Sequence, residues 1–258
     1  MHDVDVEPAV ERMATFLSEQ LAAADAEGYV VGVSGGLDSA VAATLAVDAV
    51  GPGAVTGLVL PGEPTAEANT RDASDLCADL GIEHHEVDIA PIVERFEALS
   101  PDDHGRLVLG NVRARVRMTF EYLEANATDR LVLGPTNRSE LLLGYFTKYG
   151  DGGADVRPMA DLYKSEMGDV ARALGVDERF LRKPPSAELW EGQTDEEELG
   201  ATYGTIDTVL KSLVEAGRSV EAAAERAGVP VEEARRFQRM MESTEHKREV
   251  PPYPELPR

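Results

Sequence analysis

A glycine-rich loop is the first stretch of this sequence whose residues could do chemistry. It consists of Gly32, Val33, Ser34, Gly35, Gly36, Leu37, Asp38 and Ser39. Two adjacent glycines let the backbone turn tightly, so that peptide N–H groups can approach an anion. The spacing matches neither the Walker phosphate loop nor a dinucleotide fingerprint, so we predict a phosphate-binding loop of another kind.

The segments on either side of the loop favour phosphate binding. Residues 29–33 are apolar and predict a short buried strand, and Asp38 to Val50 has the pattern of a helix. A helix that starts here would add its free N–H groups and the positive end of its dipole. The alternative is an ordinary glycine turn in which Asp38 caps the helix.

The charge balance of the chain limits its partners. Asp and Glu number 48 against 25 Lys and Arg, which gives a formal net charge of −23. A surface that binds nucleic acid needs clustered Lys and Arg, so we expect no nucleic-acid partner. Self-repulsion of this size weakens a compact state unless salt screens it, and we therefore expect a protein suited to a high-salt cytoplasm.

Lysine is scarce in this chain, which makes each lysine a better functional candidate than lysine usually is. The five are Lys148, Lys164, Lys183, Lys211 and Lys247. The alternative for each is an ordinary solvated surface residue.

Cysteine content and hydropathy limit the remaining classes. Cys77 is the only cysteine, which excludes an intrachain disulfide framework and a cysteine-only metal site. No apolar run reaches the length of a membrane span, and the acidic start does not resemble a signal peptide. We expect a cytoplasmic protein without a membrane partner.

Strands and helices alternate through the first half of the sequence. Helices are predicted over residues 8–26, 38–50, 65–80 and 107–125, and strands over 29–33, 54–60, 82–87 and 131–133. This alternation predicts an α/β fold, in which helices cover both faces of a doubly wound, mainly parallel sheet.

The second half is different in character. A glycine-rich stretch at 149–155 separates two helical segments, and residues 183–198 are expected to form a mobile loop. Helices are predicted over 199–216, 220–227 and 231–241, and the proline-rich tail at 250–254 is not helical. No linker divides the chain, so we expect a single domain over residues 1–258.

His84 and His85 lie beside Glu83 and Glu86 and suggest a metal site. Neighbouring residues of a strand point to opposite faces, however, so they do not converge on one ion. We expect a structural role for both histidines, since a closed zinc site gathers ligands from separate turns.

The glycine-rich loop resembles the Ser-Gly-Gly-x-Asp-Ser loop of the ATP pyrophosphatases, which split ATP between its α- and β-phosphates. The loop alone leaves several enzymes open, among them GMP synthetase, asparagine synthetase, argininosuccinate synthetase and tRNA-modifying ligases. Five later segments are similar to motifs of the NAD⁺ synthetases and follow in that family's order. They are residues 109–115, 146–155, 162–164, 183–189 and 245–248. The resemblance implies the adenine nucleotide alpha-hydrolase-like fold.

The resemblance implies a role for each matching residue. Those implied in binding ATP are the eight loop residues with Pro135, Thr136, Lys164 and Ser186. Those implied in contact with deamido-NAD⁺ are Arg115, Lys148, Asp155, His246 and Lys247. Asp38 and Glu140 would coordinate Mg²⁺, which prefers oxygen ligands and keeps several waters.

Three points of this assignment have alternatives. The family has Thr directly after the glycine that ends the fourth strand, whereas Gly134 is followed here by Pro135, with Thr136 one step later. Proline has neither a hydroxyl nor an N–H, so we expect Thr136 to replace that contact. Arg115 could be one of several surface arginines on its helix, and Glu140 could be a first-turn helix acid.

The implied reaction has two steps. The nicotinic-acid carboxylate of deamido-NAD⁺ attacks the α-phosphorus of ATP, which releases pyrophosphate and leaves an acyl-adenylate. Ammonia then attacks the activated carbonyl and releases AMP and NAD⁺. Positioning and positive charge suffice for this, without a covalent nucleophile, and we expect the 183–198 loop to close over the intermediate and exclude water.

Free ammonia is the expected nitrogen donor. A glutaminase module needs a catalytic cysteine and many more residues, and Cys77 lies in an ordinary helical segment. A separate glutaminase partner stays open, and the resemblance implies a homodimer. Among rivals, a tRNA-modifying ligase needs a basic surface, and a non-catalytic nucleotide-binding module would not keep Asp38, Glu140 and the lysines together.

Overall fold

A parallel sheet of four strands forms the centre of the molecule. The computed structural model describes residues 4–62, 65–100, 105–186, 192–254 and 256. The strands are β1 (Tyr29–Gly32), β2 (Val55–Val59), β3 (Glu83–Glu86) and β4 (Leu131–Leu133), in the spatial order β3-β2-β1-β4. Every neighbouring pair is parallel, so the carboxyl ends of all four strands meet at one edge.

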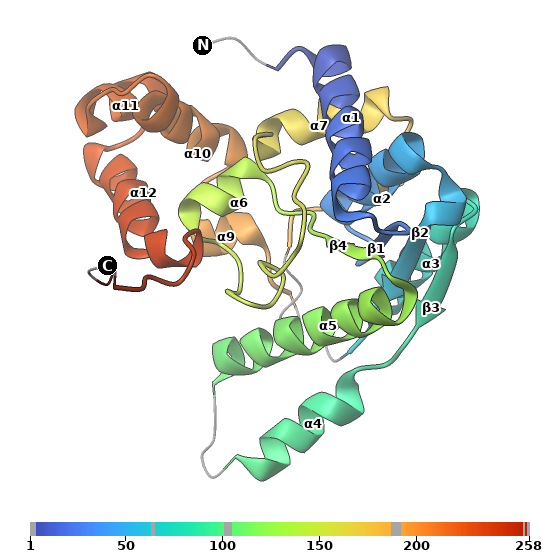
Figure 1. Ribbon diagram of the computed structural model, residues 1–258. Helices are drawn as coiled ribbons and strands as arrows, with labels where there is room; N and C mark the ends of the chain where they lie inside the picture. Colours follow the sequence, from blue (N-terminus) through green and yellow to red (C-terminus); the bar gives the residue numbers. More distant parts are fainter. Residues whose placement is uncertain (1–3, 63–64, 101–104, 187–191, 255, 257–258) are drawn as a thin grey trace.

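Helices cover both faces of the sheet (Figure 1). On one face Val31 and Val59 pack in a core shared with α1 (Val6–Ala24), α2 (Leu37–Val50) and α3 (Glu67–Asp79). The same core includes residues of α7 (Met167–Ala173) and α8 (Glu178–Leu181). Adjacent strand residues belong to the other face, where Val30 and Val132 pack with α4 (Ala90–Leu99) and α5 (Arg106–Thr128).

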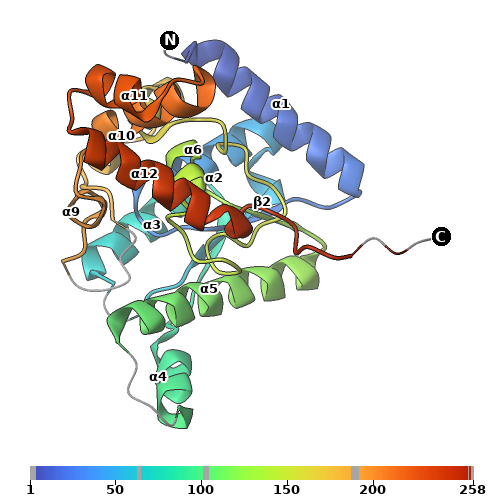
Figure 2. The ribbon, with the colours of Figure 1, turned by 90° about the vertical axis from the view of Figure 1, so that its left-hand side faces the viewer.

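The C-terminal part forms a helical cluster beside the sheet, seen face-on in Figure 2. It contains α6 (Arg138–Leu143), α9 (Asp195–Leu199), α10 (Tyr203–Leu210), α11 (Val220–Ala227) and α12 (Val231–Ser243). Leu143, Ile206 and Phe237 are fully buried in its core. The remaining turns are Pro52–Ala54, Lys164–Glu166 and Glu245–Lys247, and a π-helical turn, Lys211–Glu215, continues α10. In the described ranges no helix has the length and apolar character of a membrane span.

The predicted fold class and the four predicted strands are confirmed, but two helical predictions are wrong in detail. No helix was expected over residues 90–99, where α4 forms. Residues 195–198, expected in a loop, form most of α9, and the helix predicted from residue 199 starts instead at Tyr203, because Gly200 takes a left-handed conformation and ends α9. Thr202 then caps α10 through the N–H of Thr205, as serine and threonine often do at helix starts.

The order of the strands locates a ligand crevice. The chain leaves β1 over one face of the sheet through α2 and enters β4 from the other face through α5. In open α/β sheets, ligands bind at the carboxyl edge where the direction of winding reverses. The crevice expected from this rule lies between the ends of β1 and β4, next to the glycine-rich loop.

Candidate functional site

The glycine-rich loop joins β1 to α2 and has the local geometry of an anion site. Gly35 has φ +82°, a region that favours glycine, and a Cβ there would collide with the carbonyl oxygen of Asn69. The Ser39 hydroxyl accepts the N–H of Ser34 and donates to the carbonyl of Gly36, both at 3.1 Å. Gly36 is the N-cap residue of α2, so the free N–H groups of the helix face the loop.

Asp38, Asn137, Glu140 and Lys164 form what we call the carboxylate–lysine cluster. The Nζ atom of Lys164 lies 2.7 and 2.6 Å from the two carboxylate oxygens of Asp38 and 4.0 Å from Oε1 of Glu140. The Asn137 amide donates to Asp38 at 3.0 Å. These residues come from the start of α2, the start of α6 and the turn at 164–166, and they meet at the predicted crevice.

Charge is concentrated in this cluster, as the pKa values reflect. Burial, followed by repulsion from Asp38, raises the pKa of Glu140 well above its usual value. Burial alone would lower the pKa of Lys164, but the Asp38 and Glu140 carboxylates outweigh it and raise that pKa. Lys164 is therefore a firmly charged ammonium, and Glu140 is a carboxyl group that a further cation would help to ionise.

A buried network fixes the backbone of Lys164 and the start of α6. Asp207 is 1% exposed and accepts the hydroxyl of Ser139 at 2.5 Å and the N–H of Ser165 at 2.8 Å. Ser139 in turn accepts the N–H of Lys164 at 2.9 Å. Asn137 and Glu140 form a reciprocal capping box at the start of α6. These contacts hold Glu140 and Lys164 in a fixed relation.

Sequence reasoning missed Asn137, Asp195, Tyr203 and Asp207. The Tyr203 hydroxyl donates to the buried Asp195 at 2.9 Å, and the ammonium of Lys164 lies 5.7 Å from the Tyr203 ring centroid. Asn137 carries a recognisable signal, because polar residues directly after a strand of a parallel sheet lie at its carboxyl edge. The other three lie on helices far along the chain, where no local pattern indicated contact with the site.

Three predicted ATP residues lie on two other segments. Pro135 and Thr136 lie between Gly134 and Asn137, and Thr136 is buried at 4% exposure while Pro135 is half-buried. Ser186 is half-buried and three residues beyond Lys183, whose ammonium reaches the loop at Gly35. Part of the 183–198 segment, residues 187–191, lies outside the described residues, so the predicted closure of this loop stays a prediction.

Arg115, Lys148, His246 and Lys247 form a second group, which we call the basic cluster. Lys148 donates to the carbonyl of His246, and Arg115 donates to the carbonyl of Lys148 at 3.3 Å. Lys247 donates to the carbonyls at positions 144 and 146, at 2.7 and 2.8 Å. Four predicted dinucleotide residues, far apart in sequence, are thus in one connected set.

Asp155 is held apart from the basic cluster, at the edge of the sheet. Its carboxylate accepts the N–H of Val132 at 2.8 Å and the hydroxyl of Tyr122 at 3.1 Å. Its neighbour Val156 forms a parallel bridge to Leu133. The structure therefore joins the end of the glycine-rich stretch to β4, and the Asp155 side chain is anchored without a cation beside it in these contacts.

The lysines keep their side chains partly buried, whereas Arg115 and His246 are exposed. All five lysines of the chain are described, and every one of them is half-buried and none is exposed. Burial lowers the pKa of Lys247, an effect that Asp151 opposes. The lysines, which are scarce in the sequence, therefore all lie partly buried in the structure. These include Lys183 and Lys211, to which no role had been assigned.

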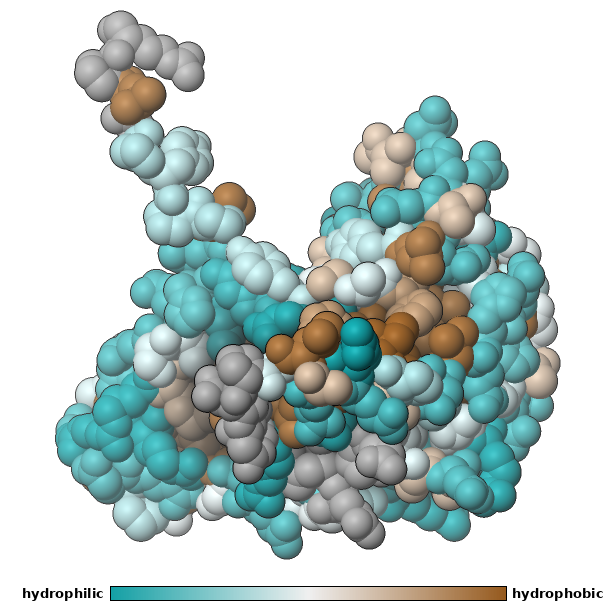
Figure 3. Space-filling model, turned by 90° about the horizontal axis from the view of Figure 1, so that it is seen from below, coloured by the Kyte–Doolittle hydropathy of each residue, from teal (hydrophilic) through white to brown (hydrophobic). Residues whose placement is uncertain are grey.

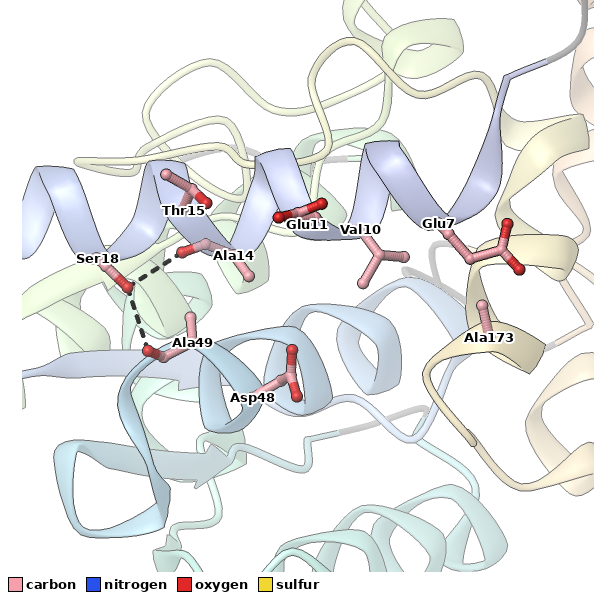
Figure 4. A pocket seen from close by; sticks show the side chains of 9 residues that line it. All are labelled: Glu7, Val10, Glu11, Ala14, Thr15, Ser18, Asp48, Ala49 and Ala173. Atoms are coloured by element: carbon pink, nitrogen blue, oxygen red, sulfur yellow. Dashed lines mark hydrogen bonds between the residues drawn. The ribbon is translucent and has the colours of Figure 1, made fainter.

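Other hollows and clusters do not compete with this site. A groove of about 420 Å³ lies between α1, α2 and α7 (Figure 4), but Glu7, Glu11 and Asp48 make its lining acidic and unsuited to phosphates. Within the described residues no three His, Cys, Asp or Glu side chains gather as a metal site. His84 and His85 lie on β3, and the structural role expected for them stays a prediction.

Comparison with known proteins is consistent with this geometry. The profile of the NAD synthase family matches residues 9–251. The NH₃-dependent NAD⁺ synthetase of Thermococcus kodakarensis is 43% identical over 256 residues, which are 99% of this chain and 100% of that protein. The structure of NMN synthetase from Francisella tularensis is similar with a TM-score of 0.87 and 36% identity, covering 98% of this chain and 100% of that one. The NH₃-dependent NAD synthetase from Campylobacter jejuni gives a TM-score of 0.83 and 31% identity, again over 98% of this chain and 100% of that one. The chain belongs to the NAD synthase family.

Proposed function

We propose that this chain is an ammonia-dependent NAD⁺ synthetase, a ligase that forms an amide bond. Its reaction converts ATP, deamido-NAD⁺ and ammonia into AMP, pyrophosphate and NAD⁺ through an acyl-adenylate. The observation that carries the proposal is the meeting of Asp38, Glu140 and Lys164 beside a phosphate-type loop. The basic cluster would supply the cations that a dinucleotide needs.

The residues of the carboxylate–lysine cluster have distinct parts in adenylation. The loop N–H groups and the start of α2 would hold the departing pyrophosphate. Lys164 carries a fixed positive charge within reach of that position, and it would offset charge that gathers on the phosphate oxygens as the carboxylate attacks. Asp38 and Asn137 orient Lys164 through the contacts already described.

The donor set of this cluster fits Mg²⁺. Asp38 and Glu140 offer carboxylate oxygens, which are the ligands this ion prefers, and phosphate oxygens with water would complete its shell. The raised pKa of Glu140 agrees with a site built for more positive charge than Lys164 provides alone. When bound, Mg²⁺ would neutralise phosphate charge and favour the reacting geometry.

The nitrogen donor that we propose is free ammonia. Cys77 is fully buried and packs against Gly57 of β2, and burial raises the pKa of its thiol to about 11. Such a thiol is protonated at neutral pH and cannot serve as the nucleophile of a glutaminase. Glutamine alone is therefore expected not to replace ammonium in the reaction. We also propose that residues 1–258 form one synthetase domain in the cytoplasm.

Two substrates are compatible with the same chemistry. The curated relative from Thermococcus is named an NAD⁺ synthetase, whereas the Francisella neighbour is named an NMN synthetase. Both names describe amidation of a nicotinic-acid carboxylate, on a dinucleotide or on a mononucleotide. We favour the dinucleotide because the basic cluster provides two ammonium groups, Lys148 and Lys247, in addition to Lys164, which we assign to ATP.

One assay tests the proposal. The protein is incubated in molar potassium chloride with ATP, Mg²⁺ and ammonium, and with either deamido-NAD⁺ or nicotinic-acid mononucleotide. We expect AMP, pyrophosphate and NAD⁺ in equal amounts from the dinucleotide, at higher kcat/KM than for the mononucleotide. Absence of amide product from both substrates would refute the proposed activity, and preference for the mononucleotide would refute the proposed substrate.

A homodimer is proposed from an apolar face of the molecule. Ile92, Phe96 and Leu99 on α4 are 38%, 56% and 67% exposed, and Leu107 and Val108 at the start of α5 are 60% and 46% exposed. Figure 3 shows the hydrophobic side chains gathered on the side where α4 lies. Contiguous exposed apolar groups on a charged protein indicate an interface. Phe96→Glu should convert a dimer into a monomer in analytical ultracentrifugation, and a wild-type monomer would refute this.

Function in strong salt is proposed from the net charge of −23. Like charges on the surface repel one another at low ionic strength, and molar salt screens them. The melting temperature should rise as potassium chloride increases from low to molar concentration. A melting temperature that falls over this range would refute adaptation to salt.

A further inference from the structure

Lys183 connects three parts of the molecule at the phosphate loop. Its ammonium donates to the carbonyl of Gly35 at 2.7 Å and to the Asn69 side chain at 2.8 Å, and it pairs with Asp72. An ammonium group has three N–H donors, and these three acceptors use all of them. The Lys183 side chain is 23% exposed, so water competes only in part with these contacts.

The contact with Gly35 determines the direction of a neighbouring N–H group. The carbonyl of Gly35 and the N–H of Gly36 belong to one planar, trans peptide unit, so the orientation of one sets that of the other. Gly36 is the N-cap of α2, and its N–H donates to the Ser34 hydroxyl at 3.3 Å, inside the loop that we assign to pyrophosphate. Gly35 has φ +82°, a region that glycine enters freely, so the orientation of this peptide depends on the Lys183 contact at its carbonyl and the Ser34 contact at its N–H.

Lys183 is itself tied to the core. Phe180, three residues earlier in the chain, is fully buried, and the Lys183 ammonium lies 5.4 Å from its ring centroid. Asn69 and Asp72 lie on α3, which packs in the same core as α2. The loop peptide is thus connected through one side chain to α3 and to the segment after α8.

We propose that Lys183 is a positioning residue for ATP, which acts by holding the Gly35–Gly36 peptide, and with it the Ser34–Gly36 turn, in the shape that receives the phosphates. It does not bind phosphate directly, because its donors are already engaged by protein oxygens. The inference rests on the proposed use of the loop for ATP. It distinguishes Lys183 from Lys164, whose ammonium lies among the carboxylates of the cluster.

Lys183→Met tests this proposal, because methionine keeps the length of the side chain and removes its donors and charge. We expect the KM and Kd for ATP to rise at least about tenfold, as for loss of a hydrogen bond to a charged group. The KM for deamido-NAD⁺ should stay within about twofold, and Lys183→Arg should recover part of the ATP affinity since guanidinium can donate to the same carbonyl. Equal increases in both KM values would contradict a role through the loop.

Arg179→Met is the matched control. Arg179 lies on α8 and faces Asp72, Asp75 and Asp79 of α3 at 3.6–3.8 Å, so it makes ion pairs with the same helix without touching the loop. We expect a lower melting temperature with an unchanged KM for ATP. If Arg179→Met weakens ATP binding as much as Lys183→Met does, general loosening of α3 explains the effect and the proposal fails.

Asp72→Asn separates positioning from direct phosphate binding. If Lys183 acts through the loop, loss of its carboxylate partner weakens its hold and raises the KM for ATP by a smaller factor than Lys183→Met. Tighter ATP binding by Asp72→Asn would mean that a released Lys183 binds phosphate itself, which overturns the proposal. Calorimetric ATP binding by these variants decides the matter even if no NAD⁺ is formed, so failure of the proposed activity is recognised separately.

Discussion

The carboxylate–lysine cluster and the basic cluster hold their lysines in opposite ways. Lys164 is bound by the carboxylate of Asp38 and lies near that of Glu140, so its positive charge is balanced by its neighbours. Lys148 and Lys247 are bound instead by main-chain carbonyls. A carbonyl accepts a hydrogen bond but carries no net charge, so neither ammonium is bonded to a carboxylate in these contacts, although Asp151 partly offsets the charge of Lys247.

The difference suits two different tasks. A reacting phosphate needs charge at an exact position, which the helix starts and the buried Asp207 network provide. A large anionic ligand must first be attracted, and in a protein of net charge −23 this needs cations whose field is not cancelled. The basic cluster places such cations on a loop and at the 245–247 turn of an acidic molecule.

Lys164→Met should give the largest effect, because it leaves Asp38 and Glu140 without the cation between them. We expect kcat to fall by about 10²–10³, as when one preorganised electrostatic contact is removed. Lys211→Met is the control, since Lys211 also pairs with a carboxylate, Glu166 at 2.7 Å, outside the cluster. Rates of NAD⁺ formation measure both; equal losses of kcat would contradict a special role for Lys164.

Glu121 lies between the two regions and gives a pH test. Its carboxyl packs against Gly32, and burial, with the nearby Asp151, raises its pKa to about 7. Between its usual pKa of 4.5 and about 7 the folded state keeps a proton that the unfolded state has lost, so stability should fall as pH rises. The decrease is on the order of 3 kcal/mol.

Urea unfolding at constant high salt from pH 4.5 to 8 measures this effect. Glu121→Gln has no proton to lose, so its unfolding free energy should depend less on pH than that of the wild type. Identical pH dependence of the two proteins would show that Glu121 titrates normally, and that the two regions are not linked through a shared buried carboxyl.

Asp207→Asn should have an intermediate effect on the first region. The amide can accept only one of the two contacts now made by the carboxylate, so Ser139 and the Lys164 backbone lose their fixed relation. We expect a loss of about 1–3 kcal/mol in unfolding free energy, with a kcat about tenfold lower. Ser212→Ala, at a buried hydroxyl on the following turn, should lower stability while kcat stays unchanged; equal kcat values in both variants would argue against positioning by Asp207.

Lys148→Met should give the smallest effect and identify the role of the second region. Removing this unneutralised charge should raise the KM for deamido-NAD⁺ about tenfold and leave kcat and the KM for ATP nearly unchanged. Lys148→Arg keeps the charge and serves as the control. A change in kcat without a change in the dinucleotide KM would place Lys148 with the reacting groups and remove the distinction between the clusters.

Much of the fold followed from local patterns. The buried strands, the glycine turn at 34–36 and the start of α2 are set by residues next to one another in the chain, and each appeared where it was expected. α4 was missed although Ile92, Phe96 and Leu99 recur at the i, i+4 and i+7 spacing typical of a helix. The break at Gly200 was missed because glycine is tolerated inside a helical pattern, and only its left-handed conformation shows that α9 ends there.

The residues of the candidate site that belong to sequence motifs could be named from the sequence. The residues that contact the site from distant parts of the chain could not. Asp38, Glu140 and Lys164 lie close together in the structure, and the roles that the resemblance implies for them stay predictions. The roles of Asp207 and Lys183 depend on contacts 42 and 148 residues away in sequence. Such contacts arise from packing of the helical cluster against the sheet, which no local spacing encodes.

The inward placement of all five lysines has a practical consequence. Reagents that acylate amines usually report on the general surface of a protein, but here Lys148, Lys164, Lys183, Lys211 and Lys247 all lie half-buried. Slow, ligand-dependent labelling would therefore report on the interior of the molecule. In this protein, the extent of amine modification at each lysine, measured by mass spectrometry, should therefore report whether nucleotide is bound.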